Sequence, residues 1–263
     1  ARTIYESVSD QAALAVVLGH ISHVYQRKAD YVSALRYSNE ALAMLQTIGD
    51  QQGIVTQSLV LGQIHLEQGN VDEARTTAQQ LLQLAQTLGY MRGVVQCLIL
   101  LGNCDVAQGW VAKSERWYAQ AKVQAKALNL QDLTALIVGK EAITLSQQGK
   151  LDKAKAAYEE AVGLWWSLNN QVELGRNLSN LGVIYLRRGD YEAAKSYYQQ
   201  AYTAVLATGA KQTIANSLIK LGNVHKRLGL YGQATGYFEE ALATYQQLEP
   251  VSYTHLTLPT SFL

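Results

Sequence analysis

Apolar side chains recur at helical spacing over residues 171–188. The recurring positions are Val172, Leu174, Leu178, Leu181 and Tyr185. Intervals mostly of three and four residues place these side chains on one face of an α-helix. Gly189 follows, and glycine readily adopts the left-handed conformation that ends helices. Asp190 is then placed to cap a second helix, which reaches about Leu206 before Gly209. The pattern predicts a hairpin of two helices.

This hairpin pattern returns every forty residues. The small residue of the first helix recurs at Ser22, Gly62, Gly102, Ala142, Gly182 and Gly222. The turn residue recurs at Ala29, Gly69, Gly109, Gly149, Gly189 and Gly229. A small residue of the second helix recurs at Ala34, Ala74, Ser114, Ala154, Ala194 and Ala234. Such a period indicates a repeat protein, in which small residues let neighbouring helices approach closely.

Proline usage supports an all-helical body. The chain has 263 residues and two prolines, Pro250 and Pro259, so the first 249 residues contain none. A proline inside a helix costs about 3 kcal/mol, and its absence over this length is what a continuous helical array requires.

The charge and the cysteine content limit which classes of partner and which cellular compartment the sequence allows. The chain carries 22 Lys and Arg against 21 Asp and Glu, which gives no overall attraction to nucleic acid or to an anionic membrane. No apolar run reaches the roughly 18 residues of a membrane span. The two cysteines, Cys97 and Cys104, lie about 10 Å apart along a helix, too far for a disulfide, and fit a reducing compartment. The sequence predicts a cytoplasmic protein with no cofactor.

The repeated motif resembles the tetratricopeptide repeat (TPR). The pattern Leu-Gly-x-x-Tyr, then Gly-Asp/Asn-Tyr, then Ala, an aromatic residue and Ala, is matched best at 180–201 and 220–241. The forty-residue period is similar to the long-helix subclass in the Leu-Gly-Asn repeat scaffolds and in bacterial signalling arrays. This resemblance implies an all-α fold, a right-handed α-solenoid of antiparallel helix hairpins.

The period divides residues 1–249 into repeat units. Six complete units are expected at 10–49, 50–89, 90–129, 130–169, 170–209 and 210–249. Residues 1–9 align with the end of a second helix, so we expect a partial unit there and a hairpin missing upstream. The faces left uncapped at the two ends lead us to expect self-association.

Residues 250–263 break the pattern. The segment "VSYTHLTLPTSFL" has no charged side chain and no helical period. Residues 251–260 resemble one reading frame of a transposon-end sequencing adapter. We interpret the tail as an unstructured cloning or sequencing artefact; the alternative is a natural extended tail that binds a partner.

The resemblance also implies where a ligand binds. In this family the first helices of the hairpins line a concave groove. The positions predicted to face it in the fifth unit are Arg176, Asn180, Val183, Leu186 and Arg187. In the sixth unit they are Asn216, Ile219, Lys220, Asn223, Lys226 and Arg227. Arg176 and Asn180 match positions that contact acidic peptides in the Leu-Gly-Asn scaffolds.

The later groove is basic. Residues 174–227 hold eight Lys and Arg against two acidic residues, a local net charge of +6. Asn side chains pair with peptide amides, and Arg or Lys with carboxylates. We therefore predict a non-catalytic scaffold that binds an acidic peptide. A merely solvated helix face and a dimer contact are the alternatives for this basic surface.

No residue pattern indicates catalysis or a metal site. His20 and His23 lie three apart on a predicted helix but have no third ligand nearby. No nucleophile, base and acid can be placed together. Two other functions stay open: a sensor segment of a larger bacterial signalling protein or transcription regulator, and the array of an enzyme whose catalytic domain is missing.

Overall fold

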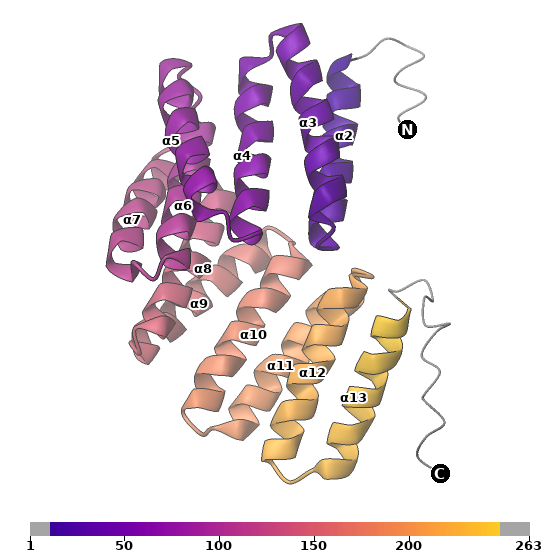
Figure 1. The fold of residues 1–263 in the computed structure, drawn as a ribbon. Helices are drawn as coiled ribbons and strands as arrows, with labels where there is room; N and C mark the ends of the chain where they lie inside the picture. Colours follow the sequence, from indigo (N-terminus) through magenta and orange to yellow (C-terminus); the bar gives the residue numbers. More distant parts are fainter. Residues whose placement is uncertain (1–10, 248–263) are drawn as a thin grey trace, which may run out of the picture. The chain divides into compact units, whose positions relative to one another are not determined.

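The structure, a computed structural model, describes residues 11–247, and over that range its regular elements are all α-helices. The described helices are α2 (Gln11–Arg27), α3 (Tyr31–Ile48), α4 (Gln51–Glu67), α5 (Val71–Thr87), α6 (Met91–Ala107), α7 (Val111–Ala127), α8 (Gln131–Gln147), α9 (Leu151–Ser167), α10 (Gln171–Arg187), α11 (Tyr191–Leu206), α12 (Lys211–Arg227) and α13 (Tyr231–Gln246). The predicted all-α hairpin architecture is confirmed (Figure 1). The expectations for residues 1–9 and 250–263 lie outside the described residues.

The chain divides into two compact units between Thr144 and Leu145, inside α8. In the first unit each helix from α2 to α7 packs on the next one along the chain. In the second unit the same holds from α9 to α13. Neighbours in sequence are thus neighbours in space within each unit, as expected of a stacked repeat.

The turns between helices repeat one backbone conformation. A residue with positive φ stands every twenty residues, at Ala29, Gly49, Gly69, Gly89, Gly109, Asn129, Gly149, Asn169, Gly189, Gly209 and Gly229. At Gly189, φ is 78°, and its N–H donates to Leu186 O at 3.1 Å while Asp190 N–H donates to Tyr185 O at 3.0 Å. Two bonds of this kind satisfy the last carbonyls of a helix. The Asp190 carboxylate in turn accepts from Ala193 N–H at 3.0 Å, which confirms the predicted cap.

The small residues of α6 and α10 lie against aromatic rings of the helices that follow them. A Cβ added to Gly182 would come within 2.5 Å of Tyr198 Cε1, and one added to Gly102 within 2.5 Å of Tyr118 Cε1. The predicted close approach is therefore confirmed, and its partner in each case is a buried tyrosine ring. In the first hairpin Ser22 takes this position, and its hydroxyl donates to a backbone carbonyl of α3 at 2.8 Å.

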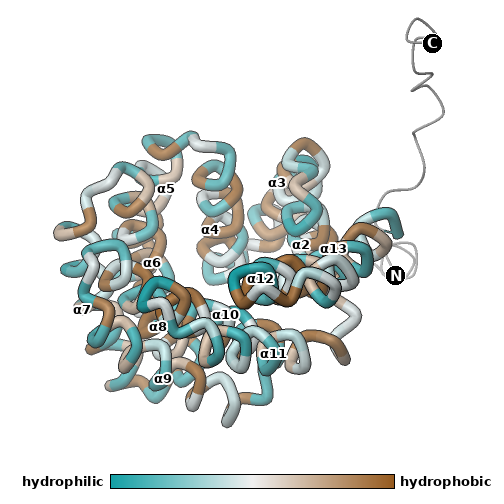
Figure 2. The backbone as a smooth tube through the Cα atoms, turned by 90° about the horizontal axis from the view of Figure 1, so that it is seen from below, coloured by the Kyte–Doolittle hydropathy of each residue, from teal (hydrophilic) through white to brown (hydrophobic). Residues whose placement is uncertain are grey.

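The core of each unit is built from the apolar stripes of these helices. Figure 2 shows hydrophobic and hydrophilic positions alternating along the same helices. Both cysteines are buried in the first unit, and burial raises the pKa of Cys97 to about 12 and that of Cys104 to about 11. They are packing residues with protonated thiols.

No described helix is long and apolar enough to cross a membrane.

Candidate peptide-binding surface

Five of the predicted groove residues follow one face of α10. Arg176 and Arg187 are exposed, and Asn180, Val183 and Leu186 are half-buried. Their spacing of three, four or seven residues keeps them on one side of the helix. The other side carries the buried leucines of the core, such as Leu178 and Leu181. The face is therefore available for contact, with apolar side chains between two arginines.

The other six form a similar face on α12. Asn216, Asn223, Lys226 and Arg227 are exposed, and Ile219 and Lys220 are half-buried. None of the eleven predicted residues is buried in the core, so each offers some surface to a ligand. Asn216 already accepts a hydrogen bond from the Tyr245 hydroxyl at 2.7 Å, which leaves its amide nitrogen to contact a partner.

Lys220 is the least exposed cation of this surface. α10 and α12 contact each other, and burial together with the nearby positive charge of Arg176 lowers the pKa of Lys220. Within residues 11–247 we find no hydrogen bond or ion pair for its ammonium group. Lys220 thus presents a partly desolvated charge with no counter-charge, which an acidic ligand would supply.

Ion pairs take up several of the other charges. Arg176 pairs with Glu173 at 2.9 Å, Arg188 with Asp152, and Lys195 with Glu192. Two of these acids, Glu173 and Asp152, lie outside residues 174–227, the stretch whose charge was counted from the sequence. The positive charge that ion pairs leave unneutralised is therefore smaller than a net +6.

Within residues 174–227, the cations that are left without acidic partners belong mainly to α12. Within the described residues we find no ion pair for Lys211, Lys220, Lys226 and Arg227, and α12 contains no acidic residue. Arg187 of α10 is held differently, since its guanidinium donates to Ser146 O at 2.9 Å and to Ser146 Oγ at 3.1 Å. Sequence counting missed Ser146 and Asp152 as partners because they come from the neighbouring repeat, about forty residues away.

A cleft of about 720 Å³ lies elsewhere in the second unit. It is formed by α9, α10 and α11 with one residue each from α12 and α13, and its walls include Val162, Trp166, Leu174, Gln199 and Tyr237. None of the eleven predicted groove residues lines it. Trp166 is 71 % exposed there, whereas its neighbour Trp165 is buried. The sequence carried no signal for this cleft, since its walls come from five helices.

In the described part of the chain, no group of three or more His, Cys, Asp or Glu side chains is placed to hold a metal ion. His20 and His23 are both exposed on α2. Burial of part of the ring and the charge of Arg27 lower the pKa of His23, which favours its neutral form.

Comparison with known families identifies the repeat. A tetratricopeptide-repeat model matches residues 132–207 and 173–247, and a second model of the same description matches 58–80. Together they cover more than half of the chain. The chain therefore belongs to the tetratricopeptide-repeat family, whose arrays are in general non-catalytic protein-interaction modules. No match is found among curated protein sequences.

Solved structures share the fold at low identity. BtubC (BKLC) from P. vanneervenii is 21% identical with a TM-score of 0.68, over 89% of this chain and 99% of that one. The Rap conjugation gene regulator of plasmid pLS20, in complex with the Phr* peptide, is 12% identical with a TM-score of 0.70, over 92% and 77%. A signal-transduction ATPase with numerous domains and a tetratricopeptide-repeat sensor, from Pyrococcus horikoshii, is 18% identical with a TM-score of 0.61, over 91% and 37%.

Proposed function

We propose that this chain is a scaffold of the cytoplasm that binds an acidic peptide segment along α10 and α12. The observation that carries the proposal is Lys220, a half-buried cation beside Arg176 without an acidic partner among the described residues. A glutamate or aspartate of the ligand would neutralise it with a charge-assisted hydrogen bond.

The rest of the surface suits an extended peptide. Asn180 and Asn223 offer both donors and acceptors, which can pair with peptide N–H and C=O groups. Val183, Leu186 and Ile219 add apolar contact between the polar residues. The similarity to a Rap regulator whose structure is known in complex with a peptide supports a peptide as the ligand class.

The test begins with an unbiased selection. A random 15-residue peptide library displayed on phage is panned against the full chain, and the binders are sequenced and measured by fluorescence anisotropy. We expect the selected peptides to be rich in Asp and Glu and to bind more weakly as salt rises, because surface charges are screened.

Two charge-matched variants locate the site. Arg176→Glu/Lys220→Glu should weaken binding at least tenfold. Lys153→Glu/Lys211→Glu changes the net charge equally, with Lys153 on α9 and Lys211 on the far side of α12 from Lys220. This control should bind like the parent. Equal affinities for all three proteins, or selected peptides without excess acidic residues, would contradict the proposal.

A second function is favoured by the 720 Å³ cleft of the second unit. Its volume falls in the range of small-molecule sites. A sensor segment of a larger regulator would use such a cleft for a small effector, and the similarity to an ATPase with a tetratricopeptide-repeat sensor is consistent with this reading. Substituting Trp166→Ala should then abolish effector binding and leave peptide binding unchanged.

A further inference from the structure

The third hairpin replaces a repeated aromatic pair by a polar one. In α2–α3 the rings of Tyr25 and Tyr37 stack with centroids 5.4 Å apart, and in α10–α11 those of Tyr185 and Tyr197 stack at 5.1 Å. The corresponding residues of α6–α7 are Asp105 and Trp117, again twelve apart. There the indole Nε1 donates to Asp105 Oδ2 at 2.9 Å.

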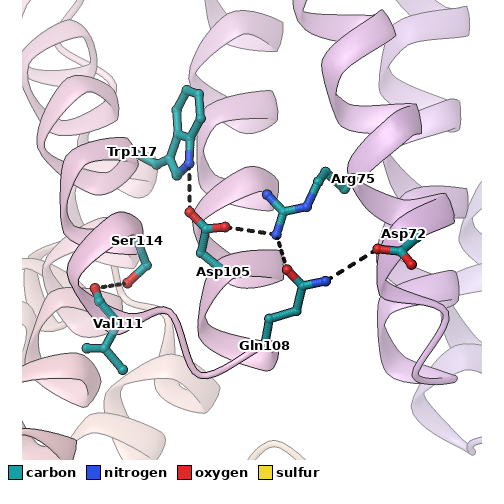
Figure 3. A network of polar contacts seen from close by, with 7 residues as sticks. All are labelled: Asp72, Arg75, Asp105, Gln108, Val111, Ser114 and Trp117. Carbon is teal, nitrogen blue, oxygen red and sulfur yellow. Dashed lines mark hydrogen bonds and ion pairs between the residues drawn. The ribbon is translucent and has the colours of Figure 1, made fainter.

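Asp105 also fixes an arginine of the preceding hairpin. Its Oδ1 lies 2.8 Å from Arg75 Nη2, and the same nitrogen donates to Gln108 Oε1 at 2.8 Å (Figure 3). Gln108 Nε2 donates in turn to Asp72 Oδ1 at 3.3 Å. Asp105 is 1 % exposed, and a buried ion pair is seldom more stable than the apolar pair it replaces. Together with the hydrogen bond to Gln108, the ion pair keeps the guanidinium of Arg75 beside the buried carboxylate.

The held guanidinium still has donors to offer. Both contacts of Arg75 use Nη2, and among the described residues we find no partner for Nη1 or Nε. Arg75 lines a cleft of about 370 Å³ with Trp110, Lys113, Arg116 and Trp117. Asp105 also borders the cleft; its Oδ1 is ion-paired with Arg75 but accepts no hydrogen bond among the described residues, and its Oδ2 accepts from Trp117.

Two cations lie over a half-exposed indole in this cleft. Lys113 Nζ lies 3.9 Å and Arg75 Cζ 5.3 Å from the Trp110 ring centroid, and Trp110 is 45 % exposed. Lys113 and Arg116 are exposed, and in the described part of the chain we find no acidic partner for either. The cleft therefore combines a flat apolar surface with an excess of positive charge.

The backbone adds to this charge. Trp110 precedes α7 without a side-chain cap, and the first turn of α7 has no acidic residue. In the corresponding place α11 has the Asp190 cap and Glu192. Cations beside a helix N-terminus are unfavourable because the helix dipole is positive there. An anion bound at this point would relieve that repulsion.

We propose that this cleft binds a small free aromatic anion, a planar ring that carries a phosphate or a carboxylate. The ring lies against Trp110, and the anion is held by Arg75, Lys113 and Arg116. The volume of about 370 Å³ suits one such ring with its charged group. The site is built from the first unit alone and is independent of the peptide surface on α10 and α12.

Calorimetric titration of the full chain tests the proposal with four probes: phenyl phosphate, benzoate, cyclohexyl phosphate and inorganic phosphate. We expect phenyl phosphate or benzoate to bind at least tenfold more tightly than cyclohexyl phosphate and inorganic phosphate. The first two probes distinguish a phosphate from a carboxylate ligand. No binding of either aromatic probe at millimolar concentration, or equal binding of all four, overturns the proposal.

Variants tie the binding to these residues. Lys113→Glu/Arg116→Glu should lower the affinity at least tenfold, and Trp110→Leu should remove the preference for an aromatic ring. Lys150→Glu/Lys153→Glu makes the same charge change at the N-terminus of α9 and should bind like the parent. Circular dichroism checks the fold; if the double variant is unfolded, Trp110→Leu decides. Unchanged affinity and ring preference in the folded variants contradicts the site.

Discussion

Two hairpins of this chain share a backbone plan and differ in chemistry. In α6–α7 and α10–α11 alike, a glycine of the first helix touches a buried tyrosine of the second, as Gly102 does Tyr118 and Gly182 does Tyr198. Asp105 and Trp117 are twelve residues apart, as are Tyr185 and Tyr197. The first pair forms a hydrogen bond, whereas the second pair stacks its rings. The contact inside the hairpin is kept, whereas the neighbouring position accepts different side chains.

The largest difference between the hairpins should appear at the polar pair. Asp105→Asn leaves the charge of Arg75 without its buried partner and should lower the free energy of unfolding by about 2–3 kcal/mol. Tyr185→Phe at the equivalent position keeps the ring stack and should cost less than about 1 kcal/mol. Urea unfolding followed by circular dichroism measures both. Equal losses of unfolding free energy in the two variants would mean that the ion pair does not contribute to stability.

The shared glycine contact should respond alike in both hairpins. Gly102→Ala and Gly182→Ala each place a methyl group against a tyrosine ring and should each cost about 2 kcal/mol. Gly163→Ala is the control, because no atom lies within 4 Å of a Cβ at that position of α9. It should raise stability by up to about 1 kcal/mol, since alanine favours helix over glycine. A large difference between the first two variants would contradict the equivalence of the hairpins.

The hydroxyl groups of the two buried tyrosines, Tyr118 and Tyr198, should contribute differently to stability. The Tyr118 hydroxyl donates to Asn103 Oδ1 at 2.9 Å, so Tyr118→Phe should cost about 1 kcal/mol at pH 7. No hydrogen bond of the Tyr198 hydroxyl is found within residues 11–247, and Tyr198→Phe should be nearly neutral. Thermal unfolding at pH 7 measures the difference, and a greater loss in Tyr198→Phe would reverse this assignment.

Alkaline pH gives a further test of Tyr198. Burial raises its pKa from 10.0 to about 12, so the folded state favours the neutral phenol. This contribution is complete below pH 10 and is lost as the pH rises through 12. The parent should therefore lose more stability between pH 9 and 11 than Tyr198→Phe does, by about 1 kcal/mol. Parallel losses in the two proteins would show that the phenol ionises freely.

The smallest expected effect concerns the helix caps. Asp190→Ala removes the cap of α11 and should lower stability by about 0.5–1 kcal/mol, while Asp190→Asn should change little because asparagine also caps. Trp110 holds the N-cap position before α7 and makes no such bond, so the two hairpins differ here as well. Thermal unfolding of the two Asp190 variants measures how much the cap stabilises the protein. Equal losses of stability in the two variants would show that the capping hydrogen bond does not contribute.

The features that could be predicted from the sequence are those set by residues close together along the chain. The hairpins, the left-handed turn at Gly189 and the cap at Asp190 depend on side chains a few residues apart, and all were predicted. The faces of α10 and α12 could likewise be placed from helical spacing. Their ion pairs could not, because Arg188 meets Asp152 from the neighbouring repeat.

The sequence by itself determined the repeat: a forty-residue period, two helices in each unit, and small residues where helices touch. These features follow from backbone conformation and packing, which any one repeat already encodes. Only the tertiary structure decided which charges are neutralised and which stay open. It left Lys220 without a partner in the described residues and held Arg75 between Asp105 and Gln108. Such contacts join side chains from different repeats, and their distances arise only when the hairpins stack.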